Sequence, residues 1–299
     1  MEKRIKLAKI NPERVADEIE KFIVNEITSI NFSGGVIGLS GGIDSTTTAA
    51  LSKRAFDNYN LNSDKKLELV GYIMPSDTNS PDDEKDAKSV AERLNIRYEI
   101  VPIEPIIESF KRVIPKVTEN SYIRGNLKAE VRAILLHQLA AYEKKLVIGT
   151  GNRDEDFGVA YYTLFGDGAV HMSPIGGLPK RLVREIAGYL GFSDLTKRIP
   201  TAGLEAGQTD FKDLGYYYET VEAVSEGKFQ GLSKIEIINN PLIKELTRKD
   251  IIDYRRLYGK SKFPCAERIV EDIFMRNKIA EAKGNIVHPP QPKITMEYN

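Results

Sequence analysis

The sequence contains very little cysteine and has no net charge. Its single cysteine, Cys265, excludes both an intrachain disulfide and a zinc site built from several cysteines, and it fits a reducing cytoplasm. The 43 basic and 43 acidic residues cancel, so the chain has no overall field that would attract a nucleic-acid backbone. An anionic ligand must therefore be held by a local site.

Long apolar runs are also absent. No run approaches the roughly 18 residues that a membrane helix needs. The basic residues near the N-terminus are not followed by the apolar core of a signal peptide. We therefore expect a cytoplasmic protein that has neither a membrane nor a nucleic acid as its partner.

The composition of the 299 residues predicts a globular chain, with 41% hydrophobic and 29% charged residues, and we expect a single domain over residues 1–299. Short apolar runs alternate with helical patterns. We expect strands at 36–39, 67–74, 97–103 and 146–149, and helices at 12–30, 46–56, 82–94, 127–143 and 180–190. This alternation predicts an α/β fold with a doubly wound, mostly parallel sheet and helices on both faces.

Ligands of such sheets bind beyond the carboxyl ends of the strands. Three unusual loops, residues 40–45, 75–83 and 150–156, follow expected strand ends. Residues 203–215 are polar and rich in glycine, which predicts a mobile loop that can act as a lid. The C-terminal residues 284–299 contain three prolines, which predict an extended tail.

The first of these loops has the composition of a phosphate-binding loop. Gly41 and Gly42 let backbone N–H groups turn toward a ligand, the following helix presents its positive end, and Ser40 and Ser45 add hydroxyl donors. Asp44 repels phosphate unless a Mg²⁺ ion bridges the two. The lysine of a Walker loop is absent, which argues against transfer of a γ-phosphate. The alternative is a tight strand–helix turn that is capped by a serine.

Together with other motifs, this loop resembles a known family. The hexapeptide Ser-Gly-Gly-Ile-Asp-Ser at 40–45 is similar to the signature loop of the N-type ATP pyrophosphatases, which cleave ATP between its α- and β-phosphates. Further motifs resemble those of ammonia-dependent NAD synthetases. They are Gly149-Thr150-Gly151-Asn152, Gly166-Asp167-Gly168, Ser173–Lys180, Pro200–Leu204 and Gly207-Gln208-Thr209-Asp210.

This resemblance implies an activity. In that family, ATP and Mg²⁺ adenylate the nicotinate carboxylate of deamido-NAD with release of pyrophosphate, and ammonia then displaces AMP to give NAD. The expected cofactor is therefore Mg²⁺, the expected ligands are ATP, ammonia and deamido-NAD, and the expected assembly is a homodimer. Catalysis of this kind depends mainly on positioning and on charge neutralisation at the phosphates.

The resemblance also assigns residues of the ATP site. The expected ATP-binding residues are Ser40, Gly41, Gly42, Ile43, Asp44, Ser45, Thr150, Lys180 and Thr201. Asp44 and Lys180 are expected to be catalytic, and Asp44 and Glu155 to bind Mg²⁺. Counting from Gly149 gives Glu155 as the second metal ligand, whereas counting back from Gly166 gives Asp156, which stays an alternative.

The acceptor side departs from the family pattern. Arg132, Asp167 and His171 are expected to contact deamido-NAD. Positions at which the family has other residues are filled here by Glu130, Leu164, His171 and Asn285-Ile286. Two alternatives therefore stay open, a related ligase that acts on a different carboxylate and a non-catalytic nucleotide sensor.

Three other features have simpler interpretations. Cys265 is expected to be an unreactive thiol, because a glutaminase would need a domain of its own, so ammonia must come from solution or from a partner. His137 lies in an apolar helical pattern and is expected to be a buried histidine. Tyr216-Tyr217-Tyr218 either stack on a base or pack as one helix face.

Overall fold

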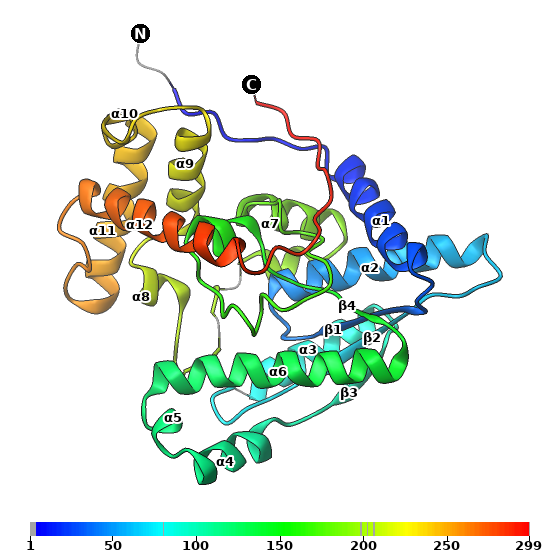
Figure 1. Ribbon diagram of the computed structural model, residues 1–299. Helices are drawn as coiled ribbons and strands as arrows, with labels where there is room; N and C mark the ends of the chain where they lie inside the picture. The colour runs from blue at the N-terminus through cyan, green and yellow to red at the C-terminus, as the bar shows by residue number, and fades with distance from the viewer. Residues whose placement is uncertain (1–3, 80, 198, 202, 206, 299) are drawn as a thin grey trace.

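A four-stranded parallel sheet forms the centre of the protein (Figure 1). The structure is a computed structural model that describes residues 4–79, 81–197, 199–201, 203–205 and 207–298. The strands are β1 (Gly34–Gly38), β2 (Glu68–Ile73), β3 (Arg97–Ile100) and β4 (Leu146–Val147), in the spatial order β3-β2-β1-β4. Because every strand pair is parallel, the loops that follow the four strands lie at one edge of the sheet.

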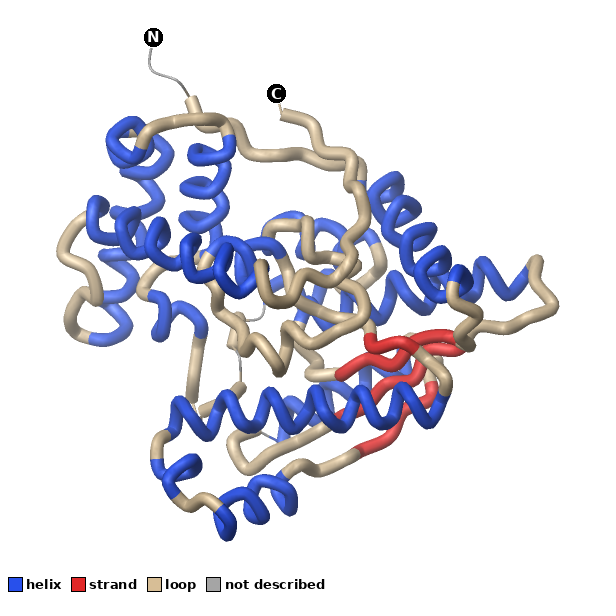
Figure 2. Tube along the Cα trace, in the orientation of Figure 1, coloured by secondary structure: helices blue, strands red, loops and turns tan. Residues whose placement is uncertain are grey.

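Helices cover both faces of this sheet (Figure 2). One face carries α1 (Pro12–Ser29), α2 (Ile43–Leu61), α3 (Pro81–Arg93) and α7 (Lys180–Tyr189), and the other carries α4 (Glu104–Val113), α5 (Lys116–Glu119) and α6 (Ser121–Glu143). Within β1, Val36 and Ile37 belong to different cores, since neighbouring residues of a strand point to opposite faces. The predicted doubly wound α/β fold is therefore confirmed.

Some predicted boundaries are wrong. The long helix α6 begins at Ser121 rather than at residue 127, because the side chain of Asn120 accepts a hydrogen bond from the Ile123 N–H and caps the helix. Strand β4 has two residues, after which the chain continues through an isolated bridge between Ile148 and Met172. Strand β3 ends at Ile100, three residues before the predicted end.

The short helix η1 (Asp154–Gly158) lies between β4 and α7. The predicted elements stop at residue 190, but the chain beyond it is largely helical, with η2 (Ser193–Lys197), α8 (Asp210–Leu214), α9 (Tyr218–Phe229), α10 (Lys234–Asn239), α11 (Pro241–Tyr258) and α12 (Ala266–Gly284). Helices α9 to α12 lie together on one side of the molecule and build a core of their own (Figure 1). Tyr216 and Tyr218 are buried in that core, which fits a packed face.

The segment predicted as a loop at 203–215 contains α8, which ends at Gly215 with a φ of 88°. The tail runs beside α1, where Glu297 forms a bridge with Lys9 and the Thr295 N–H donates to Glu18 Oε2 at 2.8 Å. No helix among the described residues has the length and apolar character that crossing a membrane requires.

Candidate active site

The predicted phosphate loop connects β1 to α2. Ser40 Oγ lies 2.9 Å from Ser45 Oγ, and the Gly42 N–H donates to Ser40 Oγ at 3.2 Å, so the loop is closed by its own hydroxyl groups. Gly41 has a φ of 72°, and a Cβ there would lie 2.9 Å from the backbone nitrogen of Ala87 in α3, so the position requires glycine. The N-cap of α2 is Gly42, which has no side chain to accept from the first turn. The N–H groups of that turn are suited to an anionic ligand.

A buried lysine lies next to this loop. Lys180 is the first residue of α7, and its Nζ is 2.5 Å from Asp44 Oδ2 and 2.7 Å from Glu155 Oε1. Its side chain is 3% exposed. Burial alone would lower the pKa of Lys180, but Asp44, Glu155 and Asp210 together raise it, so the lysine stays charged. The structure thus brings together both predicted catalytic residues and the predicted metal ligand Glu155.

Asn152 fixes the two carboxylates relative to each other. Its Nδ2 donates to Asp44 Oδ1 at 3.1 Å, and its Oδ1 accepts the N–H groups of Asp154 and Glu155, each at 3.1 Å. The Asn152 side chain is fully buried. Because the two N–H groups belong to the start of η1, Asn152 determines where Glu155 projects.

Burial makes three carboxyl groups near Lys180, those of Glu155, Asp154 and Asp210, harder to ionise. It raises the pKa of Glu155 to about 7, with Asp44 and Asp210 acting in the same direction and Lys180 opposing them. Burial also raises the pKa of Asp154 to about 8 and raises that of Asp210. Among the described residues, Asp154 Oδ1 and Asp210 Oδ1 are buried without a hydrogen-bond partner. The centre therefore favours a cation in addition to its lysine.

Asp44 and Glu155 fit a Mg²⁺ ion that is bound together with phosphates. In the part of the chain that the structure describes, no three His, Cys, Asp or Glu residues are arranged to hold a metal by themselves. Mg²⁺ usually takes one or two protein carboxylates and completes its shell with water and substrate phosphates. Asp156 lies differently, since its carboxylate fills the space beside Gly151, where a Cβ would come within 2.2 Å of Asp156 Oδ2.

The two threonines that were predicted to bind ATP occupy different settings. Thr150 is half-buried in the loop after β4. Thr201 is exposed, and its Oγ1 donates to the Gln208 carbonyl at 2.8 Å and accepts the Gly203 N–H at 3.1 Å. The hydroxyl of Thr201 therefore has its partners within its own segment.

The three predicted acceptor residues each have a hydrogen-bond partner within the protein. Arg132 of α6 donates to the Met74 carbonyl at 3.0 Å and to Asn79 Oδ1 at 3.2 Å, so it supports the loop after β2. Asp167 Oδ2 accepts the Thr163 N–H at 3.1 Å, and the Asp167 carboxylate interacts electrostatically with Arg132.

His171 lies at the edge of β4. Its Nδ1 accepts the Val147 N–H at 3.0 Å, so in the neutral ring the proton is on Nε2. Burial, with a smaller contribution from His137, lowers the pKa of His171, which keeps the ring neutral. His137 is half-buried, and its Nε2 bonds to the carbonyl of Ala169 at 2.9 Å. The expected buried histidine is therefore only half-buried, although its ring has a hydrogen-bond partner.

Sequence reasoning missed Asn152, Asp154 and Asp210 as residues of the site. Asn152 and Asp210 each end a motif that carries the family resemblance, so the signal was present in the sequence. Asp154 gave no comparable signal. Its Oδ2 accepts the backbone N–H of Lys180 at 2.8 Å, a contact that only the fold creates.

The doubly wound sheet, the glycine-rich loop at its carboxyl edge and the carboxylate–lysine centre define a nucleotide-binding α/β protein. The family follows from comparison with known proteins. The family model described as NAD synthase matches residues 15–263. The chain belongs to the NAD synthase family, which confirms the resemblance inferred from the motifs.

Curated relatives and solved structures agree with this assignment. The chain is 38% identical to an NH(3)-dependent NAD(+) synthetase of Methanosarcina acetivorans over 232 residues, which cover 76% of this chain and 87% of that protein. It is also 38% identical to one of Methanocaldococcus jannaschii, with 75% and 85% covered.

Among solved structures, the NMN synthetase of Francisella tularensis has a TM-score of 0.70 at 27% identity, with 92% of this chain and 96% of that chain covered. The NH3-dependent NAD synthetase of Campylobacter jejuni, at 23% identity and a TM-score of 0.64, supports the fold, with 96% and 100% covered.

Proposed function

We propose that this protein is an ammonia-dependent NAD synthetase. It adenylates the carboxylate of deamido-NAD with ATP, releases pyrophosphate, and then forms NAD when ammonia displaces AMP. The observation that carries this function is the centre in which Lys180 contacts both Asp44 and Glu155 beside the phosphate loop. A nucleotide sensor without catalysis has no need for such a charged centre, whereas an enzyme that cleaves ATP at its α-phosphate does.

ATP binds at the carboxyl edge of the sheet. Its phosphates are held by Ser40–Ser45 and the first turn of α2, with Thr150, Lys180 and Thr201 around them. The geometry of the loop supports this assignment, because the first turn of α2 has no side-chain cap and its N–H groups are therefore suited to an anionic ligand. Lys180 then stabilises negative charge on the phosphates.

Asp44 and Glu155 hold Mg²⁺ in this proposal. When bound, the ion neutralises phosphate charge and orients the phosphates. The protein prepares the site in two ways: Asn152 holds Asp44 and the start of η1 together, and Lys180 keeps both carboxylates close before ligands bind. The contact with Lys180 favours Glu155 over Asp156 as the second ligand.

The acceptor is bound by Arg132, Asp167 and His171. Deamido-NAD is the acceptor that the family favours. A second candidate, nicotinate mononucleotide, is favoured by the likeness to the structure described as an NMN synthetase and by the departures at Glu130 and Leu164. Both acids present the same nicotinate carboxylate to the site, so the same chemistry applies to either.

The enzyme works as a cytoplasmic homodimer in this proposal. Apolar side chains at the ends of α4 and α6 are exposed, with Val113 78%, Tyr122 75% and Tyr142 88% exposed, and a second copy that covered some of them would reduce this exposed apolar area. Light scattering of the purified protein tests this, since a monomer at working concentration would contradict it.

The deciding experiment measures AMP and amide formation in parallel. Wild type and Asp44→Ala are incubated with ATP, Mg²⁺ and ammonium, and with deamido-NAD or nicotinate mononucleotide in separate reactions. We expect one AMP per NAD from deamido-NAD, and no product from the variant. Product from the mononucleotide alone would change the acceptor and keep the chemistry, whereas no AMP with either acid would contradict the proposed function.

A further inference from the structure

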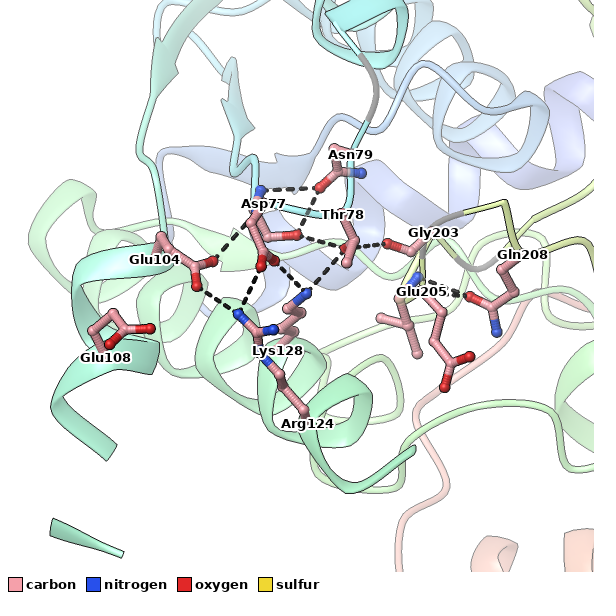
Figure 3. Close-up of polar contacts among 12 residues, drawn as sticks. Asp77, Thr78, Asn79, Glu104, Glu108, Arg124, Lys128, Gly203, Glu205 and Gln208 are labelled. Atoms are coloured by element: carbon pink, nitrogen blue, oxygen red, sulfur yellow. Dashed lines mark hydrogen bonds and ion pairs between the residues drawn. The ribbon is translucent and has the colours of Figure 1, made fainter. Parts of the chain in front are cut away.

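A lysine that the active site does not use is completely buried near the start of α6. Lys128 has no exposed surface, and its Nζ lies 2.7 Å from Asp77 Oδ1 and 3.0 Å from Thr78 Oγ1 (Figure 3). A buried ammonium group is retained only where such partners stabilise its charge. Arg124, one turn earlier on the same helix, holds the other oxygen of Asp77 at 2.7 Å. Lys128 and Arg124 thus fix the Asp77–Thr78 turn that follows β2.

Thr78 connects Lys128 with the segment around Gly203. Its Oγ1 accepts from Lys128, because an ammonium group has only donors, which leaves the hydroxyl proton for another partner. Two further oxygens lie within reach, Ser76 Oγ at 3.1 Å and the carbonyl of Gly203 at 3.2 Å (Figure 3). Because the carbonyl can only accept whereas the serine hydroxyl can donate, the Thr78 hydroxyl donates to Gly203. The hydroxyl of one threonine therefore connects a buried lysine of α6 with a segment that lies 125 residues further along the chain.

We name residues 203–205 and 207–208 the lid segment. Besides the Thr78 bond, it touches α6 through Leu204, whose Cβ would lie 3.1 Å from a Cβ at Gly125. It is also bonded internally, because Gln208 Oε1 accepts the N–H groups of Leu204 at 2.8 Å and Glu205 at 3.2 Å. Contacts of this kind hold the lid segment as one unit against the start of α6.

The residues that flank the lid segment are ones assigned to the nucleotide site. Thr201 precedes it and is bonded to the Gln208 carbonyl. Asp210 follows it, and its charge acts on Lys180 and Asp44. A shift of the lid segment away from α6 would therefore move both Thr201 and Asp210.

We propose that Lys128 and Thr78 are positioning residues, which hold the lid segment against α6 and thereby place Thr201 and Asp210 at the nucleotide site. This inference rests on the proposed function, since the residues being placed serve nucleotide binding. Lys128 itself touches neither Lys180 nor the phosphate loop in the contacts that the described residues make; its effect passes through Thr78.

Thr78→Val tests the connection with little change in side-chain volume, and Thr78→Ser is the matched control that keeps the hydroxyl. Amide hydrogen exchange of Leu204 and Glu205 is measured without any substrate, and the affinity for ATP with Mg²⁺ is measured by a binding titration without turnover. We expect exchange to become about fivefold faster and ATP binding about fivefold weaker in Thr78→Val, as for loss of one hydrogen bond of ordinary strength. Thr78→Ser is expected to behave like wild type.

The result that overturns the proposal is exchange or ATP affinity in Thr78→Val that equals that of wild type. Both measurements are made without turnover, so they decide the role of Thr78 even if no acceptor is amidated. The proposed function would fail separately, through absence of AMP formation by wild type.

Lys128→Met, combined with Thr78→Val, tests whether both residues act along one path. If they do, the double variant loosens the lid segment no more than Thr78→Val alone, because the lysine acts through the threonine. Effects that multiply would contradict this path. In Lys128→Met, Asp77 keeps its ion pair with Arg124, so we expect the Asp77–Thr78 turn still to form.

Discussion

Removal of the lysine at the active centre should weaken the fold and abolish activity together. Lys180→Met leaves Asp44 and Glu155 without their common cation, in side chains that are 17% and 19% exposed. Breaking a buried ion pair by removing one partner costs about 3–5 kcal/mol. With an unfolding entropy of about 2.1 cal/mol/K per residue, this corresponds to a fall in Tm of about 5–8 °C for a chain of this size.

The loss should depend on pH in a defined direction. The pKa of Glu155 is raised from 4.5 to about 7 by burial, so this residue is mostly protonated at pH 5.5 and mostly ionised at pH 8.5. A raised carboxyl pKa in the folded state means that its ionisation opposes folding, and this opposition develops as pH rises through about 7. Lys180 offsets it in wild type. Because the charge of Lys180 lowers the pKa of Glu155 in wild type, Lys180→Met is expected to raise that pKa further and to lose more in Tm at pH 8.5 than at pH 5.5.

Lys145→Met is the matched control for this experiment. Lys145 is also a buried lysine between two carboxylates, at 3.0 Å from Glu68 and 2.9 Å from Glu143, but it lies at the amino end of β4, away from the site. We expect a smaller loss of stability from this variant, because Arg97 still pairs with Glu68 and Glu143, with AMP formation by the folded protein unchanged. Equal losses in Tm at both pH values, or AMP formation that survives in Lys180→Met, would refute the reasoning.

Three further predictions follow from individual contacts. Arg97 and Lys145 lower the pKa of Glu143 from 4.5 to about 2, so Glu143→Gln should lose about 3 kcal/mol of stability at neutral pH. In wild type this stability is present above pH 4.5 and is lost as pH falls toward 2; urea unfolding of both proteins over this range should show the two stabilities converging, and a constant difference would contradict the assignment. Asn152→Ala leaves two buried N–H groups without a partner, at about 1–3 kcal/mol each, and frees Asp44, so both Tm and ATP affinity should fall; wild-type ATP affinity would argue against its role. Gly125→Ala should gain up to about 1 kcal/mol in helix propensity while its Cβ presses on the Leu204 Cβ, so we expect weaker ATP binding without a lower Tm, restored by adding Leu204→Gly, which removes that Cβ; ATP binding equal to that of wild type would argue against this contact.

The sheet was predictable from the sequence because each strand except β3 is buried and reads as a short apolar run. Val36 and Ile37 are completely buried on opposite faces, so β1 needs apolar residues throughout. The helices after residue 190 were missed for a different reason. In α9, buried polar residues such as Glu222 and Glu226 interrupt the apolar pattern, and they are stable there because Arg181 and Arg153 pair with them across the fold. No local pattern reveals a partner that is 41 or 73 positions away.

For the active site, too, the residues were predictable from the sequence but their spatial arrangement was not. Asp44, Glu155 and Lys180 could be predicted because they belong to motifs whose order along the chain is characteristic of the family. Their arrangement could not, since a sequence does not show that the three side chains meet at one lysine nitrogen.

The charge balance around Lys180 explains why the site needs a bound cation in addition to the lysine. Asp44, Glu155 and Asp210 surround one ammonium group, so full ionisation of all three would leave an excess of two negative charges in a largely buried volume. Burial together with the neighbouring carboxylates raises the pKa of Glu155 and Asp210, so both groups hold their protons more strongly than exposed carboxyl groups do. A divalent cation bound beside these carboxyl groups would favour their ionised forms. We therefore expect binding of Mg²⁺ with ATP to release protons from this centre at pH 7, which calorimetry in buffers of different ionisation enthalpy can measure. Glu155→Gln should reduce the number released, and a number unchanged by this variant would exclude Glu155 as their source.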